Sequence, residues 1–278
     1  GERWDVDFSL FTNSATFGDA LAVADNRAVI GVPGSGSGSG RVSVYTFHPD
    51  GSETSVSLTP SSAPTAARFG ASVAIVAGAV VVGAPGEDIV VSPNTRVDAG
   101  AAYVYELTGS TWDEVARFTA AVPENTGQFG ASVAISGTDT AVPEAILIGS
   151  PREAGTDGAV YVYRRGTSVW AQSLHITTPP QPQTFQQLGV AVALDGRYGL
   201  IGSNTYPGNG LFTAGAVYGV EFNSSFSSAT LTLRTDPLAD TSDRLGTSIA
   251  IDRDGPTVFV GSPDADLYGN SNQGVVLS

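Results

Sequence analysis

The chain has 278 residues and a formal net charge of −14, from 27 acidic side chains against 13 basic ones. This balance opposes binding to nucleic acid and to anionic membranes, so we expect neither partner. The absence of Cys excludes disulfides, thiolate metal sites and cysteine nucleophiles, and no apolar run is long enough to be inserted across a membrane as a helix.

The N-terminal segment, residues 1–16, contains the run Trp4–Leu10, WDVDFSL. A similar run, WDEVARF, spans Trp112–Phe118, and the remaining tryptophan, Trp170, opens a third. A large ring that returns at one position of a repeat typically packs between strands. We therefore predict an outer strand over residues 4–10.

A repeated pattern then begins at Phe17 and returns at Phe69, Phe129, Leu188 and Leu245, at intervals of 52, 60, 59 and 57 residues. Each copy opens with Phe-Gly or Leu-Gly in a strand rich in small residues. An apolar strand that contains Gly follows, and after a loop a third strand opens with Gly; the second copy reads FGASVAI, AVVVGAP and GAAYVYE. A fixed period of this size indicates a repeat architecture. A strand that is apolar on both faces must be covered on both, as in radially stacked sheets.

The combination of Phe69-Gly70 with Gly83-Ala84-Pro85 resembles the FG-GAP repeat. This repeat is the blade motif of the integrin α-subunit propeller and of many bacterial surface proteins. The bacterial-type variant, which has a short first turn and a downstream Trp, is the most similar form. The resemblance covers essentially the whole chain and implies a β-propeller.

We predict an all-β fold, a five-bladed β-propeller of four-stranded antiparallel blades, as a single domain over residues 1–278. The predicted blades span about 17–60, 69–120, 129–178, 188–235, and 245–278 together with 1–16. The last copy stops inside its third strand, so the N-terminal strand would pair in the last blade, close the ring and cover both edges. The alternative is part of a seven-bladed propeller.

The loops between second and third strands lie on the same side of a four-stranded meander as the connections between blades. These are the long segments of the chain, and variable loops on a rigid scaffold tend to carry recognition. We therefore predict that this side is the ligand-binding face and that it is acidic. The candidate residues are Glu87, Asp88, Asp98, Glu153, Asp157, Tyr206, Asp264 and Asp266.

Two groups of oxygen-bearing side chains are candidate ligands for calcium, the one cofactor that we consider. Calcium takes six to eight oxygen ligands, and integrin-type blades supply them from a D-x-D-x-D-G-x-x-D loop in the first turn. In the last copy this loop is incomplete, because Ala250 and Val258 replace its first and last Asp. The candidate metal ligands are Asp252 and Asp254 in that turn, and Asp264, Asp266, Asn270 and Asn272 in the following loop.

We expect no catalysis, because neither a nucleophile–base pair nor a zinc-ligand spacing appears, and His48 and His175 fall in different copies. The resemblance implies an extracellular or cell-surface adhesion module whose partner is a protein or a glycan. The chain has no Met, so we interpret it as a mature or excised fragment. Two alternatives stay open: a structural subunit of a surface layer or filament that self-associates, and a carbohydrate-active enzyme with carboxylates paired across the axis.

Overall fold

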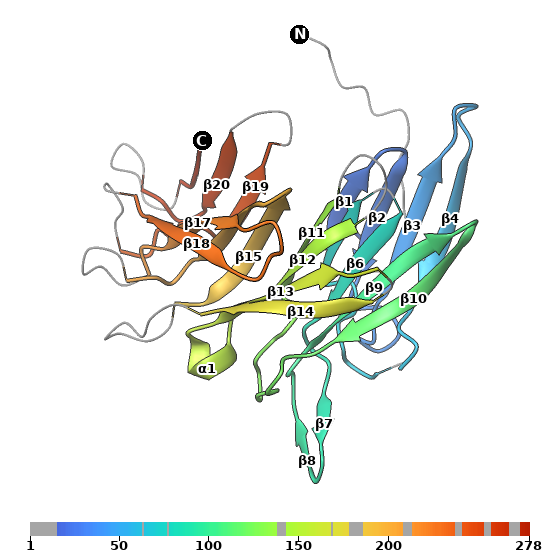
Figure 1. The fold of residues 1–278 in the computed structure, drawn as a ribbon, viewed down its shortest axis with the longest axis horizontal. Helices are drawn as coiled ribbons and strands as arrows, with labels where there is room; N and C mark the ends of the chain where they lie inside the picture. Colours follow the sequence, from blue (N-terminus) through green and yellow to red (C-terminus); the bar gives the residue numbers. More distant parts are fainter. Residues whose placement is uncertain are drawn as a thin grey trace.

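The computed structural model describes residues 16–62, 64–76, 78–137, 143–167, 169–177, 186–207, 213–236, 241–252, 257–266 and 273–278. These residues form five antiparallel sheets, which we call blades 1 to 5, and one two-stranded hairpin. Figure 1 shows the sheets from blade 1 (blue) to blade 5 (red). The all-β, five-bladed fold predicted from the repeat is therefore confirmed.

Each blade is a meander of strands that pair in chain order. Blade 1 contains β1 (Leu21–Ala24), β2 (Arg27–Val32), β3 (Arg41–Phe47) and β4 (Glu53–Leu58). Blade 2 contains β5 (Ser72–Val76), β6 (Ala79–Ala84), β9 (Ala101–Thr108) and β10 (Thr111–Phe118). Between its second and third strands, β7 (Ile89–Val91) and β8 (Asn94–Arg96) form the separate hairpin.

Blades 3 to 5 repeat the same order. Blade 3 contains β11 (Ser132–Gly137), β12 (Pro143–Ser150), β13 (Ala159–Arg165) and β14 (Trp170–Ile176), with the short α1 (Glu153–Thr156) in its loop. Blade 4 contains β15 (Leu188–Asp195), β16 (Tyr198–Ser203), β17 (Ala216–Phe222) and β18 (Ala229–Arg234). Blade 5 contains β19 (Ser248–Ile251), β20 (Val258–Ser262) and β21 (Val275–Leu277). Within the described ranges, no helix has the length and apolar character that crossing a membrane requires.

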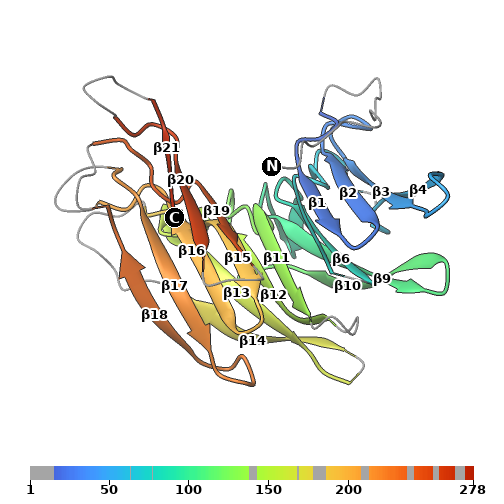
Figure 2. The same cartoon turned by 90° about the horizontal axis from the view of Figure 1, so that it is seen from above.

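The hydrophobic core lies between the blades, because the sheets of blades 2 to 4 are each covered by a neighbouring blade on both sides. The first strands of successive blades contact one another, as Figure 2 shows from above. All six residues of β6 are buried, which confirms that the apolar second strand is covered on both faces. The large residue that opens the second, third and fourth copies anchors these cores: Phe69, Phe129 and Leu188 are fully buried.

Two glycines meet at each junction between blades 1 and 2, 2 and 3, 3 and 4, and 4 and 5. A Cβ atom added to Gly149, at the end of β12, would lie 2.0 Å from the carbonyl oxygen of Gly189 in blade 4. The same contact recurs in the pairs Gly31–Gly70, Gly83–Gly130 and Gly202–Gly246. The Gly that ends the second strand and the Gly of the next copy's Phe-Gly or Leu-Gly are thus explained by one close approach between blades.

The junction between blades 5 and 1 differs from these four. Among the described residues, no heavy atom lies within 4 Å of a Cβ built on Gly18, and the three atoms nearest to a Cβ on Gly261 all belong to Ser248, in the same blade. Blade 5 shows three strands in the part of the chain that the structure describes. The outer strand predicted over residues 4–10 lies outside the described residues, so closure of the ring by the N-terminal segment stays a prediction.

Candidate functional site

The loops between second and third strands gather on one side of the blades, which we call the loop-bearing face. Figure 1 shows its most prominent segments, the hairpin β7–β8 and α1, projecting on the same side below the sheets. The predicted concentration of long loops on one face is therefore present in blades 2 and 3, whose loops the structure describes. The loops of blades 2 and 3 are described almost completely and are held from within by similar polar clusters.

In blade 2, Glu87 at the start of the loop is buried, with 2% of its side chain exposed. Its carboxylate accepts hydrogen bonds from the hydroxyl of Tyr103 at 2.6 Å and from Nε of Arg117 at 3.1 Å. Burial, followed by the hydrogen bond to Glu87, raises the pKa of Tyr103 to about 12. Burial lowers the pKa of Arg117, but the hydrogen bond to Glu87, the charge of Glu87 and the contact with Tyr103 together outweigh burial, so the net pKa is raised. We call Glu87, Tyr103 and Arg117 the blade 2 brace.

Blade 3 carries the same cluster at equivalent strand positions, with His175 in place of the Arg. The hydroxyl of Tyr161 lies 2.9 and 3.0 Å from the two carboxylate oxygens of Glu153, and Nε2 of His175 lies 3.1 Å from the nearer one. The rings of Tyr161 and His175 stack at 4.3 Å. Burial raises the pKa of Glu153 against the opposing effect of Tyr161 and His175. We call Glu153, Tyr161 and His175 the blade 3 brace.

The two braces place Glu87 and Glu153 differently from the sequence-based expectation. We predicted both as surface residues of an acidic face, but their carboxylates turn inward and hold the starts of the loops. Tyr206 of blade 4 also turns inward, because its ring meets that of Tyr218 at 6.5 Å in an edge-on arrangement. The reason is that each sits beside the third strand of its blade, whose Tyr side chain offers a partner.

The remaining predicted acids lie along the loops without forming one cluster. Asp88 is exposed and accepts a hydrogen bond from the backbone N–H of Asp98 at 2.9 Å, which ties the two ends of the hairpin loop together. Asp157 is half-buried and Asp266 is exposed. Asp264 forms an ion pair with Arg244. The predicted face thus carries scattered carboxylates on three different blades.

The candidate calcium ligands are only partly described. Asp252 and Asp266 are exposed, and Asp264 is engaged by Arg244. Asp254, Asn270 and Asn272 lie outside the described residues. Across the ranges that the structure covers, His, Asp and Glu side chains form no group of three or more that could hold a metal ion. Calcium binding therefore stays a prediction.

The hairpin β7–β8 presents apolar side chains that sequence reasoning passed over in favour of the charged ones. Val90 is 74% exposed and Val91 is 42% exposed, and Val97, directly after β8, is 50% exposed. Val97 lies at the base of the hairpin, beyond the Ile89–Arg96 pair, so we call Val90 and Val91 the valine tip. The backbone of Val97 also accepts a hydrogen bond from Thr126 and donates one to the side chain of Asn125. Two adjacent valines in an otherwise polar loop were the signal that could have located it.

On the loop-bearing side of the blades, the starts of the first strands of blades 2 to 4 surround a cavity of about 300 Å³. The residues before Phe69, Phe129 and Leu188 line it, and these are Arg68, Gln128 and Gln187. Each has a left-handed backbone, with φ between 51° and 57°. Arg152 completes the polar lining. The cavity mouth is therefore cationic, although the chain is acidic overall.

The sequence profile of the FG-GAP repeat matches residues 53–105 and 112–163. Both matched segments begin at an outer strand, β4 or β10, and end at the third strand of the next blade. The protein is a β-propeller with FG-GAP repeats. No curated protein matches it.

The frame of the match shows how this FG-GAP propeller is built. One sequence repeat combines the outer strand of one blade with three inner strands of the next, so every repeat links two blades covalently. The glycine contact holds consecutive repeats together in space. In it, the Gly near the end of one second strand lies against the Gly of the Phe-Gly or Leu-Gly that opens the next copy. The loop-bearing face is therefore carried by sheets that are locked to one another, and its loops project from a stiff support.

Proposed function

We propose that this FG-GAP propeller is a non-catalytic, extracellular or cell-surface binding module that engages a protein partner through its loop-bearing face. The observation that carries the proposal is the valine tip, Val90 and Val91, exposed on the first strand of a projecting hairpin. Exposed apolar side chains gathered on one segment are typical of interaction sites. Integrin-type adhesion proteins, which the repeat resembles, are consistent with this role.

The hairpin is built to present these side chains in a fixed place. Ile89, the first residue of β7, is only 8% exposed and packs in the core between blades 1 and 2. This contact fixes the base of the hairpin. Three residue pairs join β7 to β8, and the backbone N–H of Gly100 donates to the carbonyl of Glu87 at the base. A preformed element loses little conformational freedom on binding, so more of its contact energy appears as affinity.

The chemistry of the tip favours a protein over a glycan as the partner. Valine methyl groups offer no hydrogen bonds to sugar hydroxyls, but they fit the apolar pockets of a protein surface. Burying one exposed valine contributes about 1.5 kcal/mol or more. Two such anchors would account for at least a hundredfold in affinity at about 1.4 kcal/mol for each factor of ten.

The experiment compares two variants on arrays of purified extracellular proteins and of glycans. Val90→Thr with Val91→Thr removes the apolar tip and keeps the β-branched shape of the strand. Val169→Thr is the matched control, because Val169 is 69% exposed but lies between β13 and β14 on the opposite face. We expect protein hits that the double variant loses and the control retains. Binding to glycans alone, or equal binding by both variants, would contradict the proposal.

A structural subunit is the second candidate function, and the free edge of blade 5 favours it. Within the described residues β21 pairs only with β20, and exposed strand edges can pair with another chain. Light scattering over a range of protein concentrations distinguishes the two functions. A monomer at all concentrations supports the binding module, whereas growth into larger assemblies supports the structural subunit.

A further inference from the structure

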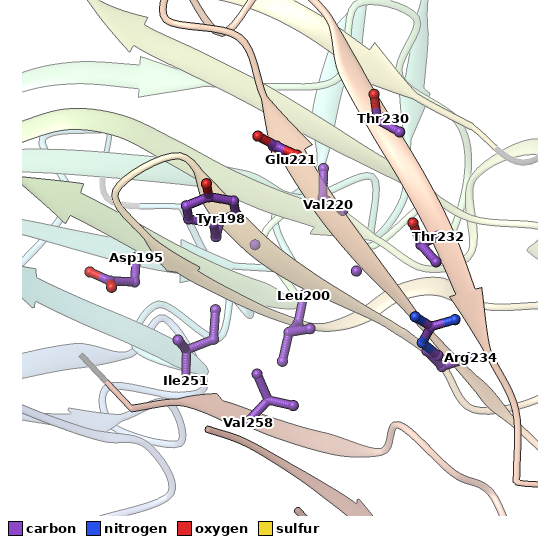
Figure 3. Close-up of a pocket in the computed structure, with 12 residues that line it drawn as sticks. Asp195, Tyr198, Leu200, Val220, Glu221, Thr230, Thr232, Arg234, Ile251 and Val258 are labelled. Carbon is purple, nitrogen blue, oxygen red and sulfur yellow. The ribbon is translucent and has the colours of Figure 1, made fainter. Parts of the chain in front are cut away.

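Two openings in the described part of the chain differ in the charges that line them. The groove between blades 4 and 5, of about 580 Å³, carries both signs: Figure 3 shows Arg234 on its wall together with Asp195 and Glu221. The cavity of about 300 Å³ on the loop-bearing side is lined by Arg68 and Arg152 and, among the described residues, by no carboxylate. Acidic side chains outnumber basic ones by 27 to 13 in this chain, so a cavity whose charged lining is only cationic departs from the rest of the sequence.

The fold holds the lining residues of this cavity in fixed places. Arg68, Gln128 and Gln187 each open a tight turn, in which the backbone N–H three residues later donates to their carbonyl oxygen at 3.0–3.1 Å. The backbone N–H of Arg152 donates to the carbonyl oxygen of Gly127 at 3.3 Å, which places Arg152 beside Gln128. The four lining residues therefore sit on backbone that is hydrogen-bonded next to the junctions between blades, as a preorganised site requires.

The equivalent positions of blade 5 show how this protein neutralises such a cation. Arg244 precedes the Leu that opens its copy, and it forms an ion pair with Asp264, which follows the Pro after the second strand. In blade 3 the position of Asp264 is occupied by Arg152, which adds a second cation. In blade 2 it is occupied by Gly86, where an added Cβ would lie only 2.6 Å from the carbonyl oxygen of Ala66. The position that supplies a counter-charge in blade 5 therefore supplies none in blades 2 and 3.

The two guanidinium groups of the cavity are available to a ligand. The arginines in ion pairs between described residues are Arg117, Arg165 and Arg244, and no described residue forms an ion pair or a side-chain hydrogen bond with Arg68 or Arg152. A guanidinium is always charged, and its N–H donors form a fork that matches a carboxylate. Because charges of one sign in a cleft with low-dielectric walls focus the electric field, the cavity should attract an anion.

The two glutamines narrow the class of anion. The carboxamides of Gln128 and Gln187 each offer N–H donors and a carbonyl acceptor. A hydroxyl can donate to such an acceptor, whereas sulfate and fully ionised phosphate have no hydrogen to donate and leave it unused. A ligand with one carboxylate and several hydroxyls therefore satisfies both the arginines and the glutamines. The volume of about 300 Å³ is at the small end of ligand sites, which suits one molecule of the size of a monosaccharide.

We propose that the cavity lined by Arg68, Gln128, Arg152 and Gln187 binds a sugar acid. The two guanidinium groups hold its carboxylate, and the two carboxamides hold its hydroxyls. The ligand is either a free sugar acid or the terminal sugar acid of a glycan, since the chemistry that the cavity recognises is the same in both. The site is separate from the valine tip, so sugar-acid binding goes beyond the proposed function and does not depend on it.

Isothermal titration calorimetry with sodium glucuronate at constant ionic strength tests the site. Arg68→Gln gives blade 2 the residue that blades 3 and 4 already carry at this position, and Arg152→Thr gives blade 3 the residue that blade 4 carries as Thr205, so both variants should fold. Arg164→Gln is the matched control, because Arg164 is exposed on β13 and does not line the cavity. We expect each cavity variant to weaken glucuronate binding by about tenfold or more, and the control to bind as the parent does.

The same titration with other ligands tests the chemical class. Glucose lacks the carboxylate and sodium sulfate lacks the hydroxyls, so both should bind more weakly than glucuronate. No binding of glucuronate to the parent chain, equal binding by the cavity variants and the control, or sulfate binding as tight as that of glucuronate would overturn the proposal.

Two comparisons complete the experiment. Val90→Thr with Val91→Thr should bind glucuronate as the parent does, so a failure of the valine tip is distinguishable from a failure of this site. An oligosaccharide that ends in glucuronate is then compared with the free acid. Tighter binding of the oligosaccharide supports a terminal sugar acid as the ligand, and equal or weaker binding supports the free acid.

Discussion

The contact between two glycines at each junction makes a sharp prediction for Gly149→Ala. A Cβ at this position would lie 2.0 Å from the carbonyl oxygen of Gly189 and 2.4 Å from Oγ of Ser132, whereas ordinary contacts of this kind lie at 3.4–4 Å. The side chain of Ser132 can rotate away, but the carbonyl belongs to the backbone of blade 4. Blades 3 and 4 must therefore separate by more than 1 Å at this point.

The size of the effect follows from the cost of overpacking a core, which is about 1–3 kcal/mol. We expect Gly149→Ala to destabilise the protein by about 3 kcal/mol, the upper end of this range, because the atom in the way is a backbone carbonyl oxygen, which cannot rotate aside as a side chain can. For a chain of this length a change of 1 kcal/mol shifts Tm by about 2 °C, so Gly149→Ala should lower Tm by about 6 °C.

The control for this experiment is Gly78→Ala. A Cβ at Gly78 meets no atom of the described residues within 4 Å, and Gly78 does not have a positive φ. Differential scanning calorimetry of both variants measures the shift directly. Equal Tm values for Gly149→Ala and Gly78→Ala would refute the argument that a close approach between blades requires these glycines.

Two further predictions concern the core and the blade 3 brace. Phe129→Ala should lower the free energy of unfolding by about 3–5 kcal/mol, because Phe129 is fully buried and its ring meets that of Tyr161 edge-on at 5.1 Å. Urea denaturation measures this change. Val115→Ala is the control and should leave the free energy of unfolding almost unchanged, because the Val115 side chain is 46% exposed. Glu153→Gln should flatten the pH dependence of stability. Burial raises the pKa of Glu153 above its ordinary 4.5, so the folded state holds this proton more tightly than the unfolded state, and the resulting stability is lost as pH rises from 4.5 through the raised pKa. A Tm that falls equally in the parent protein and in Glu153→Gln over this range would contradict this account of the brace.

Several features of the fold could be predicted from the sequence because they depend on local pattern. The five returns of Phe-Gly or Leu-Gly set the number of blades, and the apolar run Ala79–Ala84 identified a strand covered on both faces. The outer strands that begin at Trp112 and Trp170 lie where the repeat places them, apart from a difference of one residue in β10. In each case the information lies within one repeat unit, so spacing and hydrophobicity were sufficient.

The candidate site was harder to predict because it depends on side-chain direction. The loop-bearing face follows from counting strands in a meander. Whether Glu87 points to solvent or to Tyr103 depends on the path of a loop, and a charged residue in a loop is usually exposed. The valine tip was overlooked for the converse reason, since apolar residues are usually assigned to a core.

The sequence alone therefore determined the architecture: a repeat of strands separated by turn residues can bury its apolar faces only by stacking its units around one another. The tertiary structure decided which groups stand outside and which stand between the blades. Glu87 and Glu153 became internal braces because a third-strand Tyr lies beside each one. The need for glycine at the ends of the second strands is explained only by the neighbouring blade, because the atoms that exclude a Cβ there belong to a residue about 40 positions further along the chain.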